Sequence, residues 1–150
     1  MAREGLFNVL QHTISFEGIR ALELFGGTGG VTYELASRGA AQVTIVEQHA
    51  ASVAFIKKTL LEFKMNGVNV IRGDVFGFLK TATMAYDFIF ADPPYALPLL
   101  PQLPNIIIER TLLSPGGMFV LEHDGKHGFE GHPHFIKAKK YGDTFFSFFE

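Results

Sequence analysis

A carboxylate, two prolines and an aromatic ring lie together in the stretch Asp92-Pro93-Pro94-Tyr95. The apolar run at 86–91 precedes it and predicts a buried strand. Because proline has a fixed φ, the Pro93 carbonyl is held rigidly beside the acid. The Asp92 carboxylate and the Pro93 carbonyl are two hydrogen-bond acceptors next to a flat ring, and together they can hold a planar group that carries N–H donors. Alternatively, the stretch has only a structural role, as a rigid turn from strand to loop.

Three further features follow predicted strands. The run Gly26 to Gly30 can make a tight turn, and it can also let a ligand approach the backbone and the amides of a helix N-terminus. Glu47 comes about twenty residues later, where nucleotide-binding folds hold a ribose diol. Asp74 precedes a helical stretch, so it can be a helix N-cap, a ligand contact, or both. The carboxyl ends of parallel strands converge at one crevice, so we expect these residues and Asp92 to lie close together.

Two common nucleotide motifs are excluded. The dinucleotide pattern G-x-G-x-x-G fails because Thr32 occupies the place of its third glycine. A phosphate-binding loop of the Walker A type would need Gly-Lys-Ser or Gly-Lys-Thr, and neither occurs.

The elements that carry these features alternate along the chain. Periodicity and turn residues predict helices over 3–11, 30–38, 50–64, 75–79 and 103–113, and strands over 19–25, 43–46, 68–71, 86–91, 118–122, 135–140 and 144–149. A turn is expected at 114–117, and the stripe of the third helix comprises Val53, Ile56, Leu60 and Phe63. The pattern predicts an α/β fold: a mostly parallel sheet with helices on both faces and a C-terminal hairpin.

The composition fits one domain over residues 1–150. A hydrophobic content of 47% in 150 residues is enough for one core. The sequence has no Cys, no apolar leader and no membrane-length apolar run, so we expect a cytoplasmic protein without disulfides and without a membrane partner. The formal net charge of −2 is not typical of nucleic-acid binders.

The C-terminal region offers weaker candidates. A glycine-rich segment contains His123, His127, His132 and His134, which we interpret as a solvated loop rather than a metal site. The lysines at 137, 139 and 140 suit a charged edge strand at least as well as phosphate contacts. The Phe-rich run at 145–149 is expected in the sheet core.

Three stretches together resemble a known family. Glu23 to Gly30, Ser37-Arg38-Gly39-Ala40 and Asp92 to Tyr95 look like those of the class I S-adenosylmethionine-dependent methyltransferases. More narrowly, they resemble the RsmD-like family, which methylates the exocyclic N2 of a guanine in small-subunit (16S) ribosomal RNA. Residues 3–10 and 141–144 support this resemblance, which covers nearly the whole chain. It implies a Rossmann-like class I methyltransferase fold with a seven-stranded sheet.

The resemblance also implies roles for individual residues. Glu23 and Phe25 would line the methionine side of S-adenosylmethionine, Glu47 would take the ribose hydroxyls, and Asp74 would take the adenine amino group. The full implied cofactor set is Glu23, Phe25, Gly26, Gly27, Thr28, Gly29, Glu47, Gln48, Asp74, Val75 and Asp92, and the implied catalytic set is Asp92, Pro93 and Tyr95.

An aryl amine is a poor nucleophile, because its lone pair is delocalised into the ring. Asp92 and the Pro93 carbonyl would orient the amine and stabilise the positive charge that develops on nitrogen. Tyr95 would stack on the extruded base.

The chain departs from this family in two ways. Glu23, Gly26 and Thr28 stand where the family usually has Asp, Ala and Ser. The family also usually carries a basic segment ahead of the first helix, so we expect either that the sequence is a trimmed piece of a longer protein or that RNA docking is weaker. We expect a monomer acting on 16S rRNA or on a small-subunit assembly intermediate. An adenine-N6 DNA methyltransferase and a non-catalytic RNA or ribosome-assembly module are the alternatives.

Overall fold

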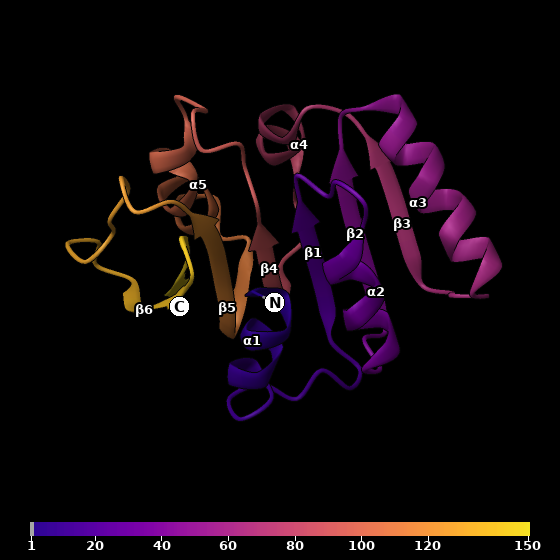
Figure 1. Ribbon diagram of the computed structural model, residues 1–150, viewed down its shortest axis with the longest axis horizontal. Coiled ribbons are helices and arrows are strands. Elements are labelled where there is room, and N and C mark those ends of the chain that lie inside the picture. Colours follow the sequence, from indigo (N-terminus) through magenta and orange to yellow (C-terminus); the bar gives the residue numbers. More distant parts are fainter. Residues whose placement is uncertain (1) are drawn as a thin grey trace.

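The computed structural model describes residues 2–150, and within them it contains a seven-stranded sheet of order β3-β2-β1-β4-β5-β7-β6 (Figure 1). Strands β1 to β5 run parallel, and β7 pairs antiparallel with both β5 and β6. The strands are β1 (Arg20–Leu24), β2 (Gln42–Glu47), β3 (Val68–Arg72), β4 (Tyr86–Ala91), β5 (Leu113–His123), β6 (Phe135–Tyr141) and β7 (Thr144–Phe149). Strand order reverses between β1 and β4, which is where open sheets of this kind bind ligands. The expected sheet and its C-terminal hairpin are confirmed.

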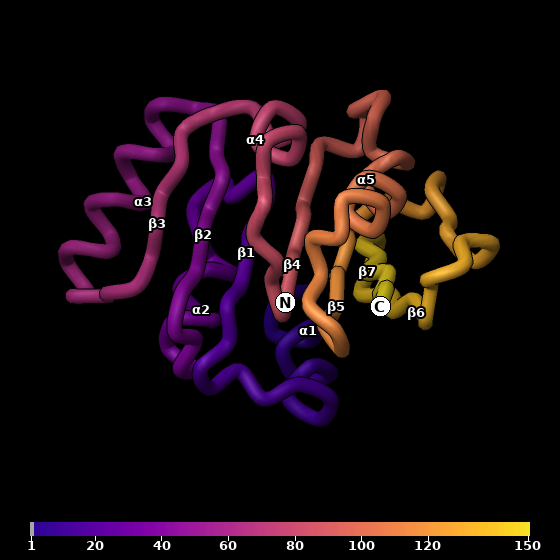
Figure 2. Tube along the Cα trace, turned by 180° about the vertical axis from the view of Figure 1, so that it is seen from behind, coloured from indigo at the N-terminus to yellow at the C-terminus, as the bar shows by residue number. Residues whose placement is uncertain are grey.

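Helices cover both faces of the sheet, as expected. They are α1 (Ala2–Leu10), α2 (Gly30–Ser37), α3 (Ala50–Glu62), α4 (Val75–Thr81) and α5 (Leu103–Glu109), with a 3-10 turn at Leu100–Gln102. Side chains of β4 alternate: Phe88 and Phe90 pack under α1 and α2, whereas Ile89 and Ala91 face the core under α4 and α5. Helix α1 lies in front of the sheet in Figure 1, and α5 comes forward when the molecule is seen from behind in Figure 2.

Two predicted helices are too long. Helix α3 ends at Glu62, and Phe63 is 67% exposed rather than part of the buried stripe, because Lys64 turns the chain with φ +51. Helix α5 ends at Glu109, because Thr111 adopts φ +56 and ends the helical path. The turn expected at 114–117 is instead an irregular part of β5, where the register against β4 shifts.

The prediction of a solvated histidine loop is wrong for His123. This residue ends β5 and is buried. Its Nε2 atom lies 2.7 Å from Ser147 Oγ, and its ring stacks on Phe145. The Phe-rich run does lie in the core, since Phe146, Phe148 and Phe149 are buried. The three lysines lie on β6, the edge strand, as expected.

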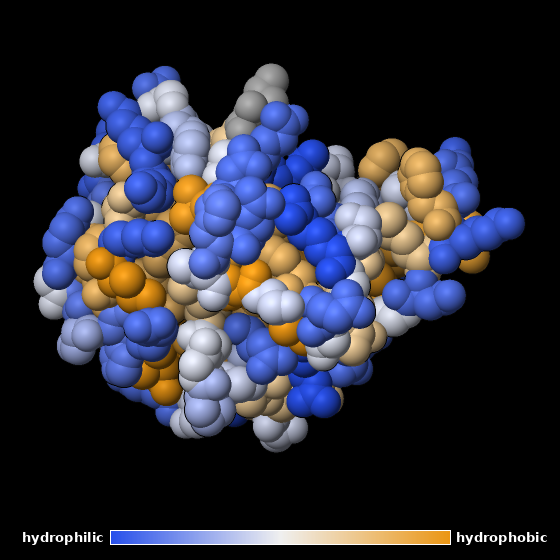
Figure 3. Space-filling view, turned by 90° about the horizontal axis from the view of Figure 1, so that it is seen from below, coloured by the Kyte–Doolittle hydropathy of each residue, from blue (hydrophilic) through white to orange (hydrophobic). Residues whose placement is uncertain are grey.

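The molecular surface has mixed polarity on the side where the parallel strands begin. Figure 3 shows small hydrophobic patches there, separated by hydrophilic residues. Within residues 2–150, no helix combines the length and the apolar character needed to cross a bilayer.

Candidate active site

The glycine turn after β1 has a backbone that other residues would not easily adopt. Gly27 and Gly29 have φ values of +57 and +84, in the left-handed region that favours glycine. Gly26 lies against β2: its N–H donates to the Val46 carbonyl, and a Cβ atom there would come within 2.5 Å of the Ile45 side chain. A larger residue at position 26 would require the Ile45 side chain to move, so packing against β2 favours glycine here.

Glu47 ties this turn to the end of β2. Its side chain is 5% exposed, and its Oε1 atom accepts a hydrogen bond from the Gly27 N–H at 2.9 Å. Its Oε2 atom accepts from the His49 N–H at 2.8 Å. No atom outside the neighbouring residues lies within 4 Å of a Cβ built on Gly27, so this side of the turn is open space.

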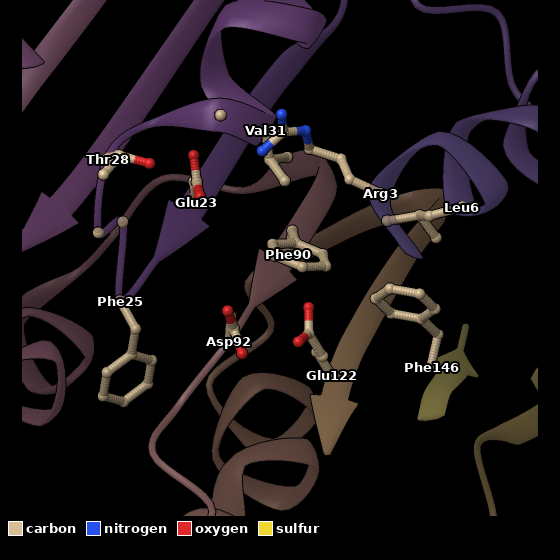
Figure 4. A pocket seen from close by; sticks show the side chains of 13 residues that line it. Arg3, Leu6, Glu23, Phe25, Thr28, Val31, Phe90, Asp92, Glu122 and Phe146 are labelled. Carbon is tan, nitrogen blue, oxygen red and sulfur yellow. The ribbon is translucent and has the colours of Figure 1, made fainter. Parts of the chain in front are cut away.

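Glu23, on β1, is an acid buried below the turn. It is 3% exposed, and its Oε1 atom accepts hydrogen bonds from both the N–H and the hydroxyl of Thr32. Burial raises the pKa of Glu23 to about 8, against the opposing effect of the Thr32 hydrogen bonds. Arg3, which reaches the same cavity from α1, is the nearby cation (Figure 4).

A cavity of about 620 Å³ opens beside the strand ends. At its rim Asp74 caps α4, since its Oδ2 atom accepts from the Gly77 N–H at 2.8 Å. The cap predicted from the sequence is therefore present, and the residue also faces the cavity. The wall consists of Phe25, Gly27, Glu47, Gln48, His49, Ser52, Asp74, Val75, Phe76, Asp92, Pro93, Pro94, Tyr95, Leu97 and Glu122.

A second cavity of about 270 Å³ adjoins the first beneath α1. Asp92 and Glu122 line both cavities, and Figure 4 shows their carboxyl groups next to each other. Asp92 keeps exposed surface at the cavities, and the partial burial of its carboxyl group raises its pKa. Burial also raises the pKa of Glu122, to about 8, and the charge of Asp92 adds to this effect. Tyr95 is 37% exposed at the mouth of the larger cavity.

The structure thus brings nearly all of the predicted site residues to two adjoining cavities, and Gly29 is the exception. Gly29 lines neither cavity; its left-handed φ of +84 accounts for this glycine, and a Cβ atom there would also meet the Tyr33 hydroxyl. The sequence analysis missed Glu122, Arg3 and His49. Glu122 ends the predicted strand 118–122, so the rule that selected Glu47 could have found it. No group of three or more potential metal ligands occurs among residues 2–150.

The sequence and fold match known proteins along the whole chain. The family profile described as "Conserved hypothetical protein 95" matches residues 1–150. The ribosomal RNA small subunit methyltransferase D of Buchnera aphidicola subsp. Baizongia pistaciae is 31% identical over 122 residues, which are 81% of this chain and 62% of that protein. The chain therefore spans less than two thirds of the length of this relative.

Solved structures show the same fold. A conserved hypothetical protein from Streptococcus pyogenes superposes with a TM-score of 0.88 at 26% identity, covering 98% of this chain and 93% of the other. The 16S rRNA N2 methyltransferase RsmC of Thermus thermophilus, in complex with AdoMet and guanosine, gives a TM-score of 0.80 at 26% identity over 97% of this chain and 41% of that one. The chain belongs to the conserved hypothetical protein 95 family, the RsmD-like family that its motifs indicate.

Proposed function

We propose that this chain is a single-domain S-adenosylmethionine-dependent methyltransferase that modifies the exocyclic N2 of a guanine in 16S ribosomal RNA. The observation that carries the proposal is the position of Asp92, which lines both cavities at the switch point of the sheet. The names of the relatives support the substrate, and the AdoMet and guanosine complex of the similar structure supports the cofactor and the base. The proposal includes a cytoplasmic monomer that acts on RNA or on a small-subunit intermediate.

The residues of the larger cavity fit the cofactor. The open space over Gly27 admits a ligand, and a volume of about 620 Å³ lies in the range of small-molecule sites. The Glu47 carboxylate is held in place by two backbone N–H groups and keeps lone pairs free for ribose hydroxyls. Asp74 and Gln48 lie on the same wall, where an adenine would bind. When bound, the cofactor would supply an electrophilic methyl group on a sulfonium.

The chain's own groups would act on the amine. The Asp92 carboxylate and the Pro93 carbonyl accept hydrogen bonds from its N–H groups, which directs the nitrogen lone pair toward the methyl group. Asp92 also stabilises the positive charge that builds up on nitrogen and can take up the proton that the nitrogen then loses. Tyr95, exposed at the mouth of the cavity, offers its ring to the extruded base.

Transfer of a labelled methyl group tests the proposal. The protein is incubated with labelled S-adenosylmethionine and, separately, naked 16S rRNA, small-subunit particles, DNA and protein, and the products are digested to nucleosides. We expect N2-methylguanosine from RNA or particles. N6-methyladenine from DNA would replace this function with adenine methylation. No label in any substrate, with the cofactor bound, would indicate a non-catalytic module.

A further inference from the structure

Glu122 lies directly beside Asp92 because of the register between two strands. Strands β4 and β5 are parallel, with Ala91 opposite Leu121. Asp92 and Glu122 are the residues that follow this pair, so they lie side by side. Side chains alternate along both strands, and Phe90 and Val120 face the core under α1. Asp92 and Glu122 therefore project to the same side of the sheet, and Figure 4 shows both carboxyl groups at the same cavity.

The two carboxyl groups are neighbours that influence each other's ionisation: burial raises the pKa of both, and the charge of Asp92 raises that of Glu122 further. Two ionised carboxylates have acceptors only, so a hydrogen bond between these neighbours requires one of the two groups to carry a proton. The charge of Asp92 raises the pKa of Glu122, so Glu122 is the member of the pair expected to carry this proton. Burial and the Asp92 charge raise the pKa of Glu122 to about 8, so Glu122 holds its proton at neutral pH.

Other charged and titratable groups surround this pair. The Tyr95 side chain also acts on Glu122 and opposes the rise in its pKa. Glu23 on β1 is a further acid near Asp92, Asp124 acts on Tyr95, and Arg3 on α1 is the cation on the far wall of the smaller cavity. With Glu23 and Glu122 both raised to a pKa of about 8, Asp92 carries the negative charge of this group of acids at neutral pH, and ionisation of Glu122 would place a second negative charge beside it.

We propose that Glu122 is a positioning residue for methyl transfer: its neutral carboxyl group donates to Asp92 and leaves the free lone pairs of Asp92 directed at the reacting amine. This role rests on the methyltransferase function proposed above. A neutral donor at position 122 holds the acceptor in place without repelling it. Loss of the proton removes the hydrogen bond and sets two negative charges side by side, so Asp92 would move away from the amine.

The pH dependence of single-turnover methyl transfer tests this role with two variants, Glu122→Gln and Glu122→Leu. The parent rate should fall as pH rises through about 8, where Glu122 ionises. Glu122→Gln keeps an N–H donor that does not ionise, so it should lose at most a few-fold in rate and should not show the fall above pH 8. Glu122→Leu removes the donor and should lose roughly 10-fold to 100-fold at every pH, as a misplaced reacting group does. Equal losses in both variants, or a flat parent profile, would overturn the proposal.

Carbon-13 NMR of labelled carboxyl groups tests the shared proton without any methyl acceptor. Glu122 should titrate near 8 in the parent and at a lower pH in Asp92→Asn, because the neighbouring charge is gone. Affinity for S-adenosylhomocysteine and the circular dichroism spectrum of Glu122→Leu check that its fold is intact. An active enzyme in which Glu122 titrates near 4.5 overturns the proposal. A titration near 8 in a protein that methylates none of the four substrates overturns the proposed function instead, while the pairing itself stands.

Discussion

The backbone N–H of Gly27 donates a hydrogen bond to Glu47 Oε1 over 2.9 Å and thereby joins the turn after β1 to the end of β2. The same carboxylate also holds the His49 N–H. One buried side chain therefore fixes two segments of the cavity wall and still has lone pairs for a ligand. Binding and loop order are thus expected to depend on the same residue.

Replacement of Glu47 by alanine should weaken binding of S-adenosylhomocysteine. A lost hydrogen bond to a charged group corresponds to about 1.5–3 kcal/mol, or roughly a 10-fold to 100-fold rise in Kd. Isothermal titration calorimetry measures this change, with NAD as a ligand that should not bind. The control is Glu62→Ala, which removes an exposed acid at the end of α3. Unchanged affinity in Glu47→Ala would show that the carboxylate only orders the loop.

Gly27→Val should abolish cofactor binding, because the side chain would occupy the open space over the turn. The matched control is Gly116→Val in β5, since Gly116 also has a positive φ, of +79, and no atom within 4 Å of an added Cβ. Both variants should lose about 1–2 kcal/mol of stability from left-handed backbone strain. Only Gly27→Val should lose cofactor binding in calorimetry. An equal loss of binding in both variants would show that backbone strain, rather than occlusion of the site, is the cause.

Asp92→Ala should lower the methyl-transfer rate by roughly 10²–10³ and leave affinity for S-adenosylhomocysteine nearly unchanged, because Asp92 acts mainly as charge develops on the amine. Asp92→Asn should lose less, since an amide oxygen still accepts a hydrogen bond. Asp87→Ala, at the opposite end of the same strand, is the control for general damage to β4. If Asp92→Ala transfers methyl groups at the rate of the parent, Asp92 has only a structural role in the turn.

Much of this site follows from sequence order, because parallel strands bring their carboxyl ends together. The glycine turn, Glu47, Asp74 and Asp92 were located in that way. The position of Glu122 at the end of a predicted strand could have indicated it in the same way, but its pairing with Asp92 depends on the register of β5 against β4, which no local pattern encodes. The burial of His123 likewise depends on Ser147, 24 residues away. Helix α5 was predicted too long because its end is set by the left-handed turn at Thr111 rather than by Gly or Pro.

Tyr95 should contribute to RNA affinity through its ring and to the proton balance through its hydroxyl. Tyr95→Ala should weaken RNA binding by about 1–3 kcal/mol, as loss of a base stack does, and fluorescence anisotropy at fixed salt measures this. Tyr95→Phe should keep the affinity. It should, however, raise the pKa of Glu122, because the Tyr95 hydroxyl lowers that pKa. RNA binding by Tyr95→Ala equal to that of the parent would exclude stacking at this ring.

The stability of the ligand-free protein should fall as pH rises from 7 to 9. Glu23 and Glu122 have pKa values of about 8 in the folded state, against an ordinary value of 4.5. Above pH 7 these groups are ionised in the unfolded state but still partly protonated in the folded state. The folded state therefore binds more protons, and raising the pH favours unfolding until both groups have ionised. Burial lowers the pKa of His123, which acts in the opposite direction but only near and below its ordinary pKa of 6.5.

Thermal unfolding of the parent, Glu23→Gln and Glu122→Gln across pH 7 to 9 measures this effect. The parent Tm should decline and then level off above the folded-state pKa values. Each glutamine variant removes one ionisation and should show a shallower decline, and the double variant should be nearly flat. For the almost fully buried Glu23 the slope cannot exceed about 1.4 kcal/mol per pH unit, the limit for one proton. A parent Tm that is constant or rises over this range would mean that both carboxyl groups are already ionised in the folded protein. Glu122 could then not donate a hydrogen bond to Asp92, and its proposed role would be contradicted.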